Sequence, residues 1–359
     1  MRGAVWDGEA LLVTDRLTLR PVAAGEVRVR VLRSGICHSD IAMMTPALPT
    51  LPIVLGHEAA GEIAELGPGV EGWAVGDRVT VGTQTPCGKC RECRRGEPHN
   101  CDINWGFVPG FPFALDGQPV ASFANVSSFA GEIVVKASQL FAIGDMPPEQ
   151  GALIGCAVST GVCASRVLGR VRAGDTVAVF GVGGIGVNAI QGAARSGAHV
   201  IAVDSNPAKE AVARQFGAAR FMLADPAHDS AGAAAMLAKA HGPIDLVVEC
   251  SGAVGAVETA FRCTKRGGRV VLIGMSRPGS QVALPLDSFV TGGEVIATMN
   301  GGALPDRDYP ELIAQARDGR LNLADQVSGV WPLDRIGDAI AALKAGEVTR
   351  ALVDHERQG

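Results

Sequence analysis

Alternating apolar and polar positions mark short strands in the first part of the chain. In the segment 26–32, Val27, Val29 and Val31 alternate with arginines, which is typical of a strand with one buried and one solvated face. Two further strands are predicted at 61–65 and 77–81, each bounded by a glycine-containing turn. Residues 1 to about 155 are therefore expected to form a compact β-rich domain.

Beyond Gly174 the pattern changes to strands that alternate with helices. Strands are predicted at 176–180, 199–204, 244–249, 269–274 and 295–299, and helices from the glycine run to 196 and at 207–216 and 255–264. Such alternation predicts a parallel sheet covered on both faces. Helices at 309–317 and 333–344 and a strand at 350–353 follow, and we expect this tail to return to the first domain.

The length of 359 residues is sufficient for two domains, each with its own core. We predict that a dinucleotide-binding domain of residues 158–299 is inserted into a first domain of residues 1–157 and 300–359.

Composition and charge exclude several classes of protein. Charged residues make up 19% and apolar residues 47% of the chain, which indicates a globular protein. A net charge of −5 disfavours a nucleic-acid partner, and the local group Lys89, Arg91, Arg94 and Arg95 is interpreted as a solvated face.

No uninterrupted apolar run has the length of a membrane helix, and no apolar segment follows the N-terminus. We therefore expect no membrane partner and a cytoplasmic, reducing location.

Four cysteines between positions 87 and 101 have the spacing of a closed zinc site. Cys87, Cys90, Cys93 and Cys101 follow the pattern C-x2-C-x2-C-x7-C, and four thiolates satisfy a tetrahedral structural zinc. Disulfides would require an oxidising compartment. An iron–sulfur run would place its fourth cysteine after three residues, with proline next, whereas Asp102 follows here. The spacing therefore favours a structural zinc lobe.

The run Gly181-Val-Gly183-Gly184-Ile185-Gly186 matches the dinucleotide fingerprint G-x-G-x-x-G. It follows a predicted strand and opens a predicted helix, and the next strand ends at Asp204. Such glycines let backbone N–H groups approach a pyrophosphate, while the acidic residue accepts hydrogen bonds from ribose hydroxyls. Asp204 would repel a 2′-phosphate, so NAD is predicted rather than NADP. Lys209 is a second candidate for the ribose, although it fits a solvated helix position almost as well.

Five motifs together carry a resemblance that covers almost the whole chain. They are G-I-C-H-S-D at 35–40, G-H-E-A-A-G at 56–61, the four-cysteine lobe, G-C-A-V-S-T-G at 155–161 and G-V-G-G-I-G at 181–186. The sequence resembles the zinc-dependent medium-chain alcohol dehydrogenase family, in its long form with a structural zinc lobe. The resemblance implies an α/β protein with a GroES-like β-rich catalytic domain and a Rossmann domain, a doubly wound parallel sheet.

The resemblance also implies a second zinc ion with three protein ligands, Cys37, His57 and Cys156. Three ligands leave one position open for water or substrate, as in catalytic zinc sites. Asp40 would orient the imidazole of His57 and Glu58 would be a second nearby carboxylate. The family's coenzyme contacts correspond here to His38, Thr160, Gly181, Gly183, Gly184, Ile185, Gly186, Asp204, Lys209, Gly274 and Arg350.

The implied reaction is reversible hydride transfer between an alcohol and NAD, with zinc polarising the alcohol oxygen. Ser39 matches the family's hydroxyl that carries the proton away. Many family members have a histidine five positions after the first cysteine ligand, but this chain has Ala42 there. We hypothesise that the proton leaves through water or the cofactor ribose.

Candidate substrate contacts, placed by motif, are mainly bulky and apolar: Thr83, Trp105, Phe123, Met275 and Met299. They favour a hydrophobic primary alcohol or its aldehyde, with a glutathione adduct of formaldehyde as a weaker option. Alternative functions are a polyol or secondary-alcohol dehydrogenase, a nicotinoprotein with permanently bound NAD, and a non-catalytic zinc and dinucleotide redox sensor.

The long segment between Cys101 and Gly155 resembles the often dimeric form of the family, so a homodimer is expected, with a tetramer as the alternative.

Overall fold

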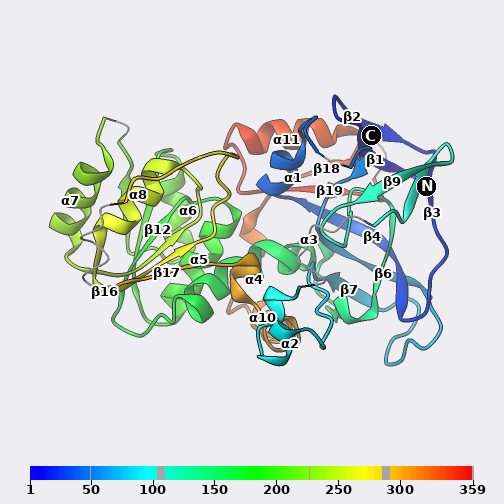
Figure 1. The fold of residues 1–359 in the computed structure, drawn as a ribbon, viewed down its shortest axis with the longest axis horizontal. Coiled ribbons are helices and arrows are strands. Elements are labelled where there is room, and N and C mark those ends of the chain that lie inside the picture. Colours follow the sequence, from blue (N-terminus) through cyan, green and yellow to red (C-terminus); the bar gives the residue numbers. More distant parts are fainter. Residues whose placement is uncertain (49, 103–109, 226, 285–291, 358–359) are drawn as a thin grey trace. The chain divides into compact units, whose positions relative to one another are not determined.

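The structure is a computed structural model that describes residues 1–48, 50–102, 110–225, 227–284 and 292–357 (Figure 1). The chain divides into two compact units. Unit 1 contains Met1–Cys156 together with Leu304–Gly359, and unit 2 contains Ala157–Ala303. Among the predicted site residues, Trp105 lies outside the described residues.

Unit 1 is built on two β-sheets. The first sheet has, in spatial order, β2 (Leu11–Thr14), β1 (Gly3–Trp6), β5 (Ile53–Val54), β9 (Gln118–Ser122), β8 (Phe113–Leu115) and β3 (Leu17–Leu19). The second has β11 (Leu140–Ala142), β7 (Arg78–Val81), β6 (Glu58–Leu66), β4 (Glu26–Ile36), β19 (Arg350–Asp354) and β18 (Val327–Pro332), with β10 (Glu132–Lys136) also paired to β4. Its helices are α1 (His38–Met43), α2 (Arg91–Arg94), α3 (Pro148–Leu153), α10 (Pro305–Arg317) and α11 (Ile336–Lys344).

The strand β4 confirms the alternation seen in the sequence. Val27, Val29 and Val31 are buried in the core of unit 1, while Arg28 and Arg30 lie on the opposite face, where they pair with glutamates of the adjacent strands. Apolar burial on one face and charge pairing on the other fix the register of this strand, since a slip of one residue would exchange the two faces.

The last strand of the chain lies beside one of the first. β19 runs antiparallel to β4, with Ala351 opposite Ile36 and Asp354 opposite Arg33, and Figure 1 shows the red β19 next to the blue β4. The C-terminal tail therefore belongs to unit 1, and any residue on β19 can reach the end of β4.

Unit 2 is a doubly wound parallel sheet. Its strands lie in the order β14 (Arg220–Leu223), β13 (His199–Asp204), β12 (Thr176–Phe180), β15 (Ile244–Glu249), β16 (Thr264–Leu272) and β17 (Glu294–Ala297), and every pair is parallel. Its described helices are α4 (Ser159–Cys163), α5 (Gly184–Arg195), α6 (Lys209–Gln215), α7 (Ser230–His241) and α8 (Val254–Cys263).

The two faces of this sheet are both covered. Val177 and Val179 of β12 belong to one hydrophobic cluster, and the intervening Ala178 and Phe180 belong to another. This explains why β12 is continuously apolar, because neither face of the strand meets solvent. The strand order reverses between β12 and β15, and ligands bind at such a switch point, beyond the carboxyl ends of the strands.

The helices α4 and α7 and the strand β14 of unit 2 lay outside the prediction from sequence. Helix α7 has the sequence SAGAAAMLAKAH, and only Ala234 and Leu237 are buried. An alanine-rich helix of this kind has no clear apolar stripe, so its periodicity was not recognisable. Strand β14 is a short edge strand without a fully buried residue, and it therefore lacks a hydrophobic signature as well.

One helical stretch, Pro148–Leu168, is long and apolar enough for a membrane span by length and composition alone. It combines α3, α4 and the π-helical turns beside them, and 83% of its most apolar window is buried within the protein. Burial of this kind is expected for a core helix as well, so the stretch is only weak evidence for a membrane.

Candidate active site and coenzyme site

The pairing of β4 with β6 brings Cys37 and His57 together. The two strands are antiparallel, and Gly35 near the end of β4 lies opposite Glu58 at the start of β6. Cys37 follows the end of β4 directly and His57 directly precedes β6. Because antiparallel neighbours exchange ends, two residues that are 20 positions apart emerge at the same place. Both are buried, with relative exposures of 6% and 4%.

A single carboxylate, that of Asp40, organises both residues. Asp40 is fully buried, and its oxygens accept hydrogen bonds from the backbone N–H of Cys37 (2.9 Å) and of Gly56 (3.0 Å). Its Oδ1 lies 3.0 Å from Nδ1 of His57. Since a carboxylate only accepts, Nδ1 carries the proton and Nε2 keeps its lone pair available to a metal. The predicted orienting contact of Asp40 is therefore present.

Cys156 reaches the same place from the helical stretch that begins with α3. It lies in a π-helical turn, Ile154–Val158, a local widening often found at functional sites. Gly155 packs directly on the backbone of Val81, where a side chain would collide with the carbonyl oxygen. The hydroxyl of Tyr309 donates a 2.9 Å hydrogen bond to the carbonyl of Gly155. Tyr309 was not recognised from sequence, because its partner is 154 positions away.

The four groups that meet here have the composition of a metal site. One ligand atom each from Cys37, His57, Glu58 and Cys156 lies within 4.8 Å of all the others, and all four residues are buried. A hydrogen bond from Cys156 and the nearby His57 hold the pKa of Cys37 well below its usual value despite burial. The pKa of Cys156 is raised well above its usual value by the neighbouring Cys37 and by burial. Buried thiol, imidazole and carboxylate groups of this kind fit a divalent cation, which would hold the thiols as thiolates.

Glu58 is also half of a buried ion pair. Its carboxylate contacts the guanidinium of Arg350, and the side chains are 0% and 2% exposed. Burial raises the pKa of Glu58, while the positive charge of Arg350 opposes this rise. Gly35 makes the arrangement possible, because a side chain there would overlap the Glu58 carboxylate. Arg350 is thus a neighbour of the cluster, and its predicted contact with a pyrophosphate remains a prediction.

The four-cysteine lobe has the geometry of a closed site. Cys87 Sγ lies 4.0 Å from Cys93 Sγ, and Cys90 Sγ lies 3.9 Å from Cys101 Sγ. Sulfur atoms 2.3 Å from a tetrahedral zinc are separated by about 3.8 Å, so the thiols fit this ion. The backbone N–H of Cys93 points at the sulfur of Cys90, and hydrogen bonds from Cys93 and Asp102 lower the pKa of Cys90 to about 6.

In unit 2 the glycine run forms the turn between β12 and α5. Gly181 has φ +89°, a conformation that favours glycine, and a side chain at Gly186 would collide with the carbonyl of Gly181. Gly183 is the N-cap of α5 and faces open space. The helix thus begins beside an open position, and the first N–H groups of a helix are suited to an anion such as a dinucleotide pyrophosphate.

Asp204 is the last residue of the neighbouring strand β13, and its side chain connects this strand to the glycine turn by a hydrogen bond. Its carboxylate accepts hydrogen bonds from the backbone N–H of Val182 (2.7 Å) and of Asn206 (2.9 Å). Lys209 lies close to it, and burial lowers the pKa of Lys209, partly opposed by Asp204. Thr160, at the start of α4, has a buried hydroxyl without a hydrogen-bond partner among the described residues, and such a group fits a ligand contact.

The remaining predicted residues lie in different surroundings. Thr83 and Phe123 are buried in unit 1, and the ring of Phe123 packs edge-on against His57 with 5.5 Å between centroids. Met275 and Met299 are exposed on unit 2, by 52% and 37%. His38 is exposed and Ser39 Oγ lies 3.3 Å from Nε2 of His57, in unit 1.

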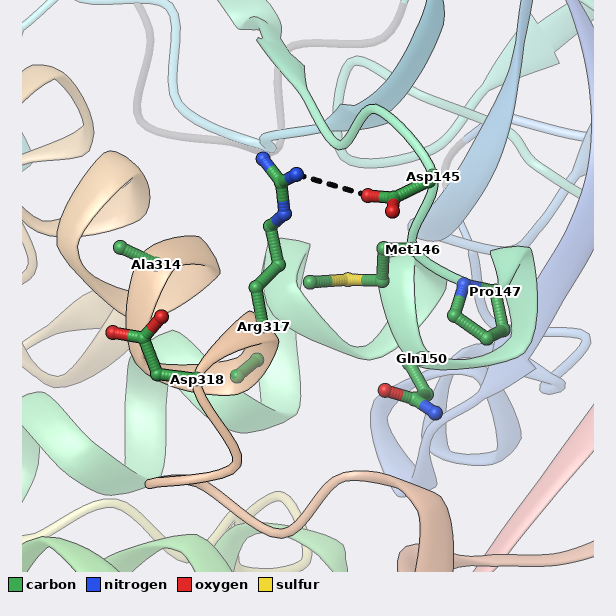
Figure 2. Close-up of a pocket in the computed structure, with 8 residues that line it drawn as sticks. Asp145, Met146, Pro147, Gln150, Ala314, Arg317 and Asp318 are labelled. Carbon is green, nitrogen blue, oxygen red and sulfur yellow. Dashed lines mark ion pairs between the residues drawn. The ribbon is translucent and has the colours of Figure 1, made fainter.

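A pocket of about 500 Å³ lies elsewhere in unit 1, between α10 and the start of α3 (Figure 2). Arg317 reaches across it to an ion pair with Asp145 at 3.0 Å (Figure 2). The lining residues are Asp145, Met146, Pro147, Gln150, Ala314, Ala316, Arg317 and Asp318. None of them is a predicted site residue, so this pocket is separate from the thiol and imidazole cluster.

Comparison with protein families matches both parts of the chain. The model of the alcohol dehydrogenase GroES-like domain matches residues 23–148, and that of the zinc-binding dehydrogenase matches residues 184–318. Among similar proteins, an S-(hydroxymethyl)glutathione dehydrogenase of Synechocystis sp. is 32% identical over 360 residues, which covers 97% of each chain. Alcohol dehydrogenase 2 of Zea mays is 30% identical over 369 residues, covering 99% of this chain and 97% of the other.

Solved structures show the same fold. An alcohol dehydrogenase zinc-binding domain protein from Burkholderia ambifaria superposes with a TM-score of 0.90 at 25% identity, over 98% of both chains. Benzyl alcohol dehydrogenase from Acinetobacter calcoaceticus gives 0.88 at 24% identity, again over 98% of both chains. At that identity, the second likeness concerns the fold alone.

Proposed function

Since this chain belongs to the zinc-dependent medium-chain dehydrogenase family, we propose that its substrates are hydrophobic primary alcohols and the corresponding aldehydes. The chain is an NAD-dependent zinc alcohol dehydrogenase with two zinc ions. The proposal concerns which residues hold these groups and which alcohol is used.

We assign the catalytic zinc to Cys37, His57 and Cys156, and the structural zinc to Cys87, Cys90, Cys93 and Cys101. The observation that carries the first assignment is the convergence of Cys37, His57 and Cys156 around one point, with Asp40 on Nδ1 of His57. A zinc ion held there supplies Lewis-acid polarisation of the alcohol oxygen, and NAD supplies the hydride acceptor.

The chain's own residues prepare the site for this chemistry. Asp40 keeps His57 in the tautomer with a free Nε2. Ser39, whose hydroxyl is 3.3 Å from that nitrogen, is the group proposed to carry the substrate proton away. Ala42, exposed on α1, offers no side-chain base, so we propose that the proton continues through water or the cofactor ribose.

The coenzyme contacts follow from the turn of unit 2. We propose that the turn at 181–186 holds the pyrophosphate and that Asp204 binds the adenosine ribose, with Lys209 beside it. Two observations support this: the N-terminus of α5 directly after the glycine turn, and the carboxylate at the carboxyl end of β13.

The aromatic ring that packs on the metal cluster supports a hydrophobic substrate. Phe123 packs on His57, Thr83 is buried, and the guanidinium of Arg350 is already paired with Glu58. A glutathione adduct would bring two carboxylates that need cations. The S-(hydroxymethyl)glutathione dehydrogenases among the relatives nevertheless make this adduct the second candidate.

A substrate panel separates the candidates. NADH formation should be measured with benzylic, allylic and aliphatic alcohols, with sorbitol, and with formaldehyde plus glutathione, on protein whose zinc content is known. We expect the highest kcat/KM for a benzylic or allylic alcohol. A higher value for formaldehyde with glutathione, or for sorbitol, would overturn the substrate proposal. One zinc per chain without turnover would indicate a sensor, and NAD released only on denaturation would indicate a nicotinoprotein.

We further propose a homodimer formed through the dinucleotide-binding unit. β17 pairs only with β16 among the described strands, and Val295 on β17 is 42% exposed. An edge strand with exposed apolar side chains is suited to pairing with a second copy. Light scattering after size exclusion should give twice the chain mass of 36.9 kDa, and a tetramer or monomer would contradict the proposal.

A cytoplasmic location remains a proposal.

A further inference from the structure

Glu249 is a buried carboxyl in unit 2 that has no part in the functions assigned above. It is the last residue of β15 and is 0% exposed. Among the described residues no lysine, arginine or histidine forms an ion pair with it. Burial raises the pKa of Glu249, and hydrogen bonds from Ser251 and Gly252 oppose that rise. Burial of a carboxyl group lowers stability unless hydrogen bonds satisfy its oxygens. The donors of these hydrogen bonds therefore indicate the role of Glu249.

The carboxylate closes the turn that follows its own strand. Its Oε1 accepts hydrogen bonds from the backbone N–H of Ser251 (2.8 Å), the hydroxyl of Ser251 and the backbone N–H of Gly252 (3.0 Å). Gly252 has φ +70°, so the backbone is held in a left-handed conformation. Three donors on one oxygen fix the orientation of this turn as a unit.

The turn touches the two neighbouring turns through backbone atoms. A Cβ on Gly181 would lie 3.1 Å from the backbone nitrogen of Ser251. A Cβ on Gly274 would overlap the nitrogen of Gly252 and lie 2.6 Å from Oε2 of Glu249. A side chain is therefore excluded at Gly274 and disfavoured at Gly181, and the turns that follow β12, β15 and β16 pack directly on one another.

These three turns lie at the edge of the sheet where a dinucleotide binds. β12, β15 and β16 are adjacent parallel strands on either side of the switch point, and their carboxyl ends face the ligand. Ser251 is exposed there whereas Glu249 beneath it is buried. Glu249 therefore acts through the turn and not by touching the coenzyme.

We infer that Glu249 is a positioning residue of the coenzyme site, whose carboxylate holds the Ser251–Gly252 turn against Gly181 and Gly274 and thereby keeps the glycine-rich turn in its binding conformation. The inference rests on the proposed role of residues 181–186 in holding the pyrophosphate. It predicts that the loss of this carboxylate weakens coenzyme binding by more than its effect on stability alone would explain.

Asp245 provides a matched control on the same strand. It lies at the opposite end of β15, where its carboxylate accepts a 2.8 Å hydrogen bond from the backbone N–H of Thr176 and pairs with Lys265. Asp245 thus also joins β15 to β12, but at the amino ends of the strands. Its replacement should lower stability without changing the coenzyme turn.

The test is calorimetric titration of the zinc-loaded protein with ADP-ribose and NADH, together with melting curves. Glu249→Ala should raise both Kd values about tenfold or more, since a buried carboxylate that accepts several hydrogen bonds is lost. Glu249→Gln, which retains an acceptor oxygen, should stay within about threefold of the wild type. Asp245→Asn should melt earlier yet bind ADP-ribose like the wild type. In steady state, Glu249→Ala should raise KM for NAD while KM for the alcohol stays unchanged.

Several outcomes would overturn the inference. Wild-type affinity in Glu249→Ala would do so, as would an equal loss of affinity in Asp245→Asn. If Glu249→Ala does not fold, Ser251→Ala replaces it: removal of one donor should raise Kd about fivefold, and an unchanged Kd counts against the inference. A wild-type protein that fails to bind ADP-ribose would overturn the coenzyme assignment itself, and that result is distinguishable from a failure confined to Glu249.

Discussion

Nδ1 of His57 lies 3.0 Å from Oδ1 of Asp40, and the same carboxylate accepts the backbone N–H groups of Cys37 and Gly56. One buried side chain thus sets the tautomer of the imidazole and also fixes the backbone on either side of the cluster. Asp40 itself is 0% exposed, so no water molecule can replace these contacts without rearrangement.

Asp40→Asn should therefore weaken metal binding and catalysis while the fold persists. An asparagine can offer its amide N–H to Nδ1 and so favours the wrong tautomer. We expect a loss of about 10- to 100-fold in kcat/KM or in zinc affinity, measured by NADH formation and metal analysis. Asp77→Asn is the control, because Asp77 also accepts a backbone N–H but lies in an exposed turn. Equal effects of the two substitutions would contradict the role given to Asp40.

Substitutions in the two cysteine clusters should have different consequences. Cys37→Ala or His57→Ala should abolish turnover and leave NAD binding intact, with one zinc per chain. Cys90→Ala should instead lower Tm by more than about 5 °C, because a structural zinc contributes to the free energy of folding. Calorimetry and metal analysis distinguish the two classes. A Cys90→Ala protein that melts like the wild type would show that the two sites are divided wrongly.

The ion pair of Glu58 and Arg350 should matter for stability mainly because each buried charge neutralises the other. Arg350→Met leaves a buried carboxylate without its cation, which should cost about 3–5 kcal/mol in the free energy of unfolding. The double variant Glu58→Gln with Arg350→Met should recover part of this loss, because no buried charge remains uncompensated. Denaturant titration of the single and double variants measures the coupling. Additive losses would mean that the pair is not coupled.

His355 should make the protein less stable in mild acid. It is held beside Ser34, whose Oγ lies 2.8 Å from Nε2, and burial lowers the pKa of His355 to about 4 from 6.5. The unfolded chain therefore binds a proton first as pH falls, so stability is retained above pH 6.5 and lost between 6.5 and 4. At pH 5 the loss should be about 2 kcal/mol.

Denaturant titrations at pH 7.5 and pH 5 test this dependence. His355→Gln should reduce the difference between the two pH values, whereas His199→Gln, at an exposed position of β13, should not. If both variants kept the full acid sensitivity of the wild type, other groups would be responsible for it.

Ala42→His should change proton release during alcohol oxidation. Position 42 is exposed on α1, three residues after Ser39, so an imidazole there could accept a proton and pass it to water. We expect faster oxidation at and below neutral pH and a shifted pH–rate profile, measured at saturating NAD. An unchanged profile would mean that the missing histidine does not limit the reaction.

Local sequence patterns were sufficient for features whose parts are close along the chain. The four cysteines of the lobe lie within 15 residues, and the glycine turn, its strand and its helix are continuous, so spacing alone defines their geometry. The strands β4, β12, β13 and β15 were likewise recognisable, because burial of one face or of both leaves a direct trace in the order of apolar residues.

Tertiary structure alone decided the contacts between distant segments. Glu58 and Arg350 are 292 positions apart, and they meet because β19 and β6 both pair with β4. Tyr309 donates a hydrogen bond to Gly155, next to Cys156. Glu249 holds Gly252, which in turn packs against Gly274. The order of apolar and polar residues does not predict such pairs, because the two partners are far apart in the sequence and meet only in the folded chain.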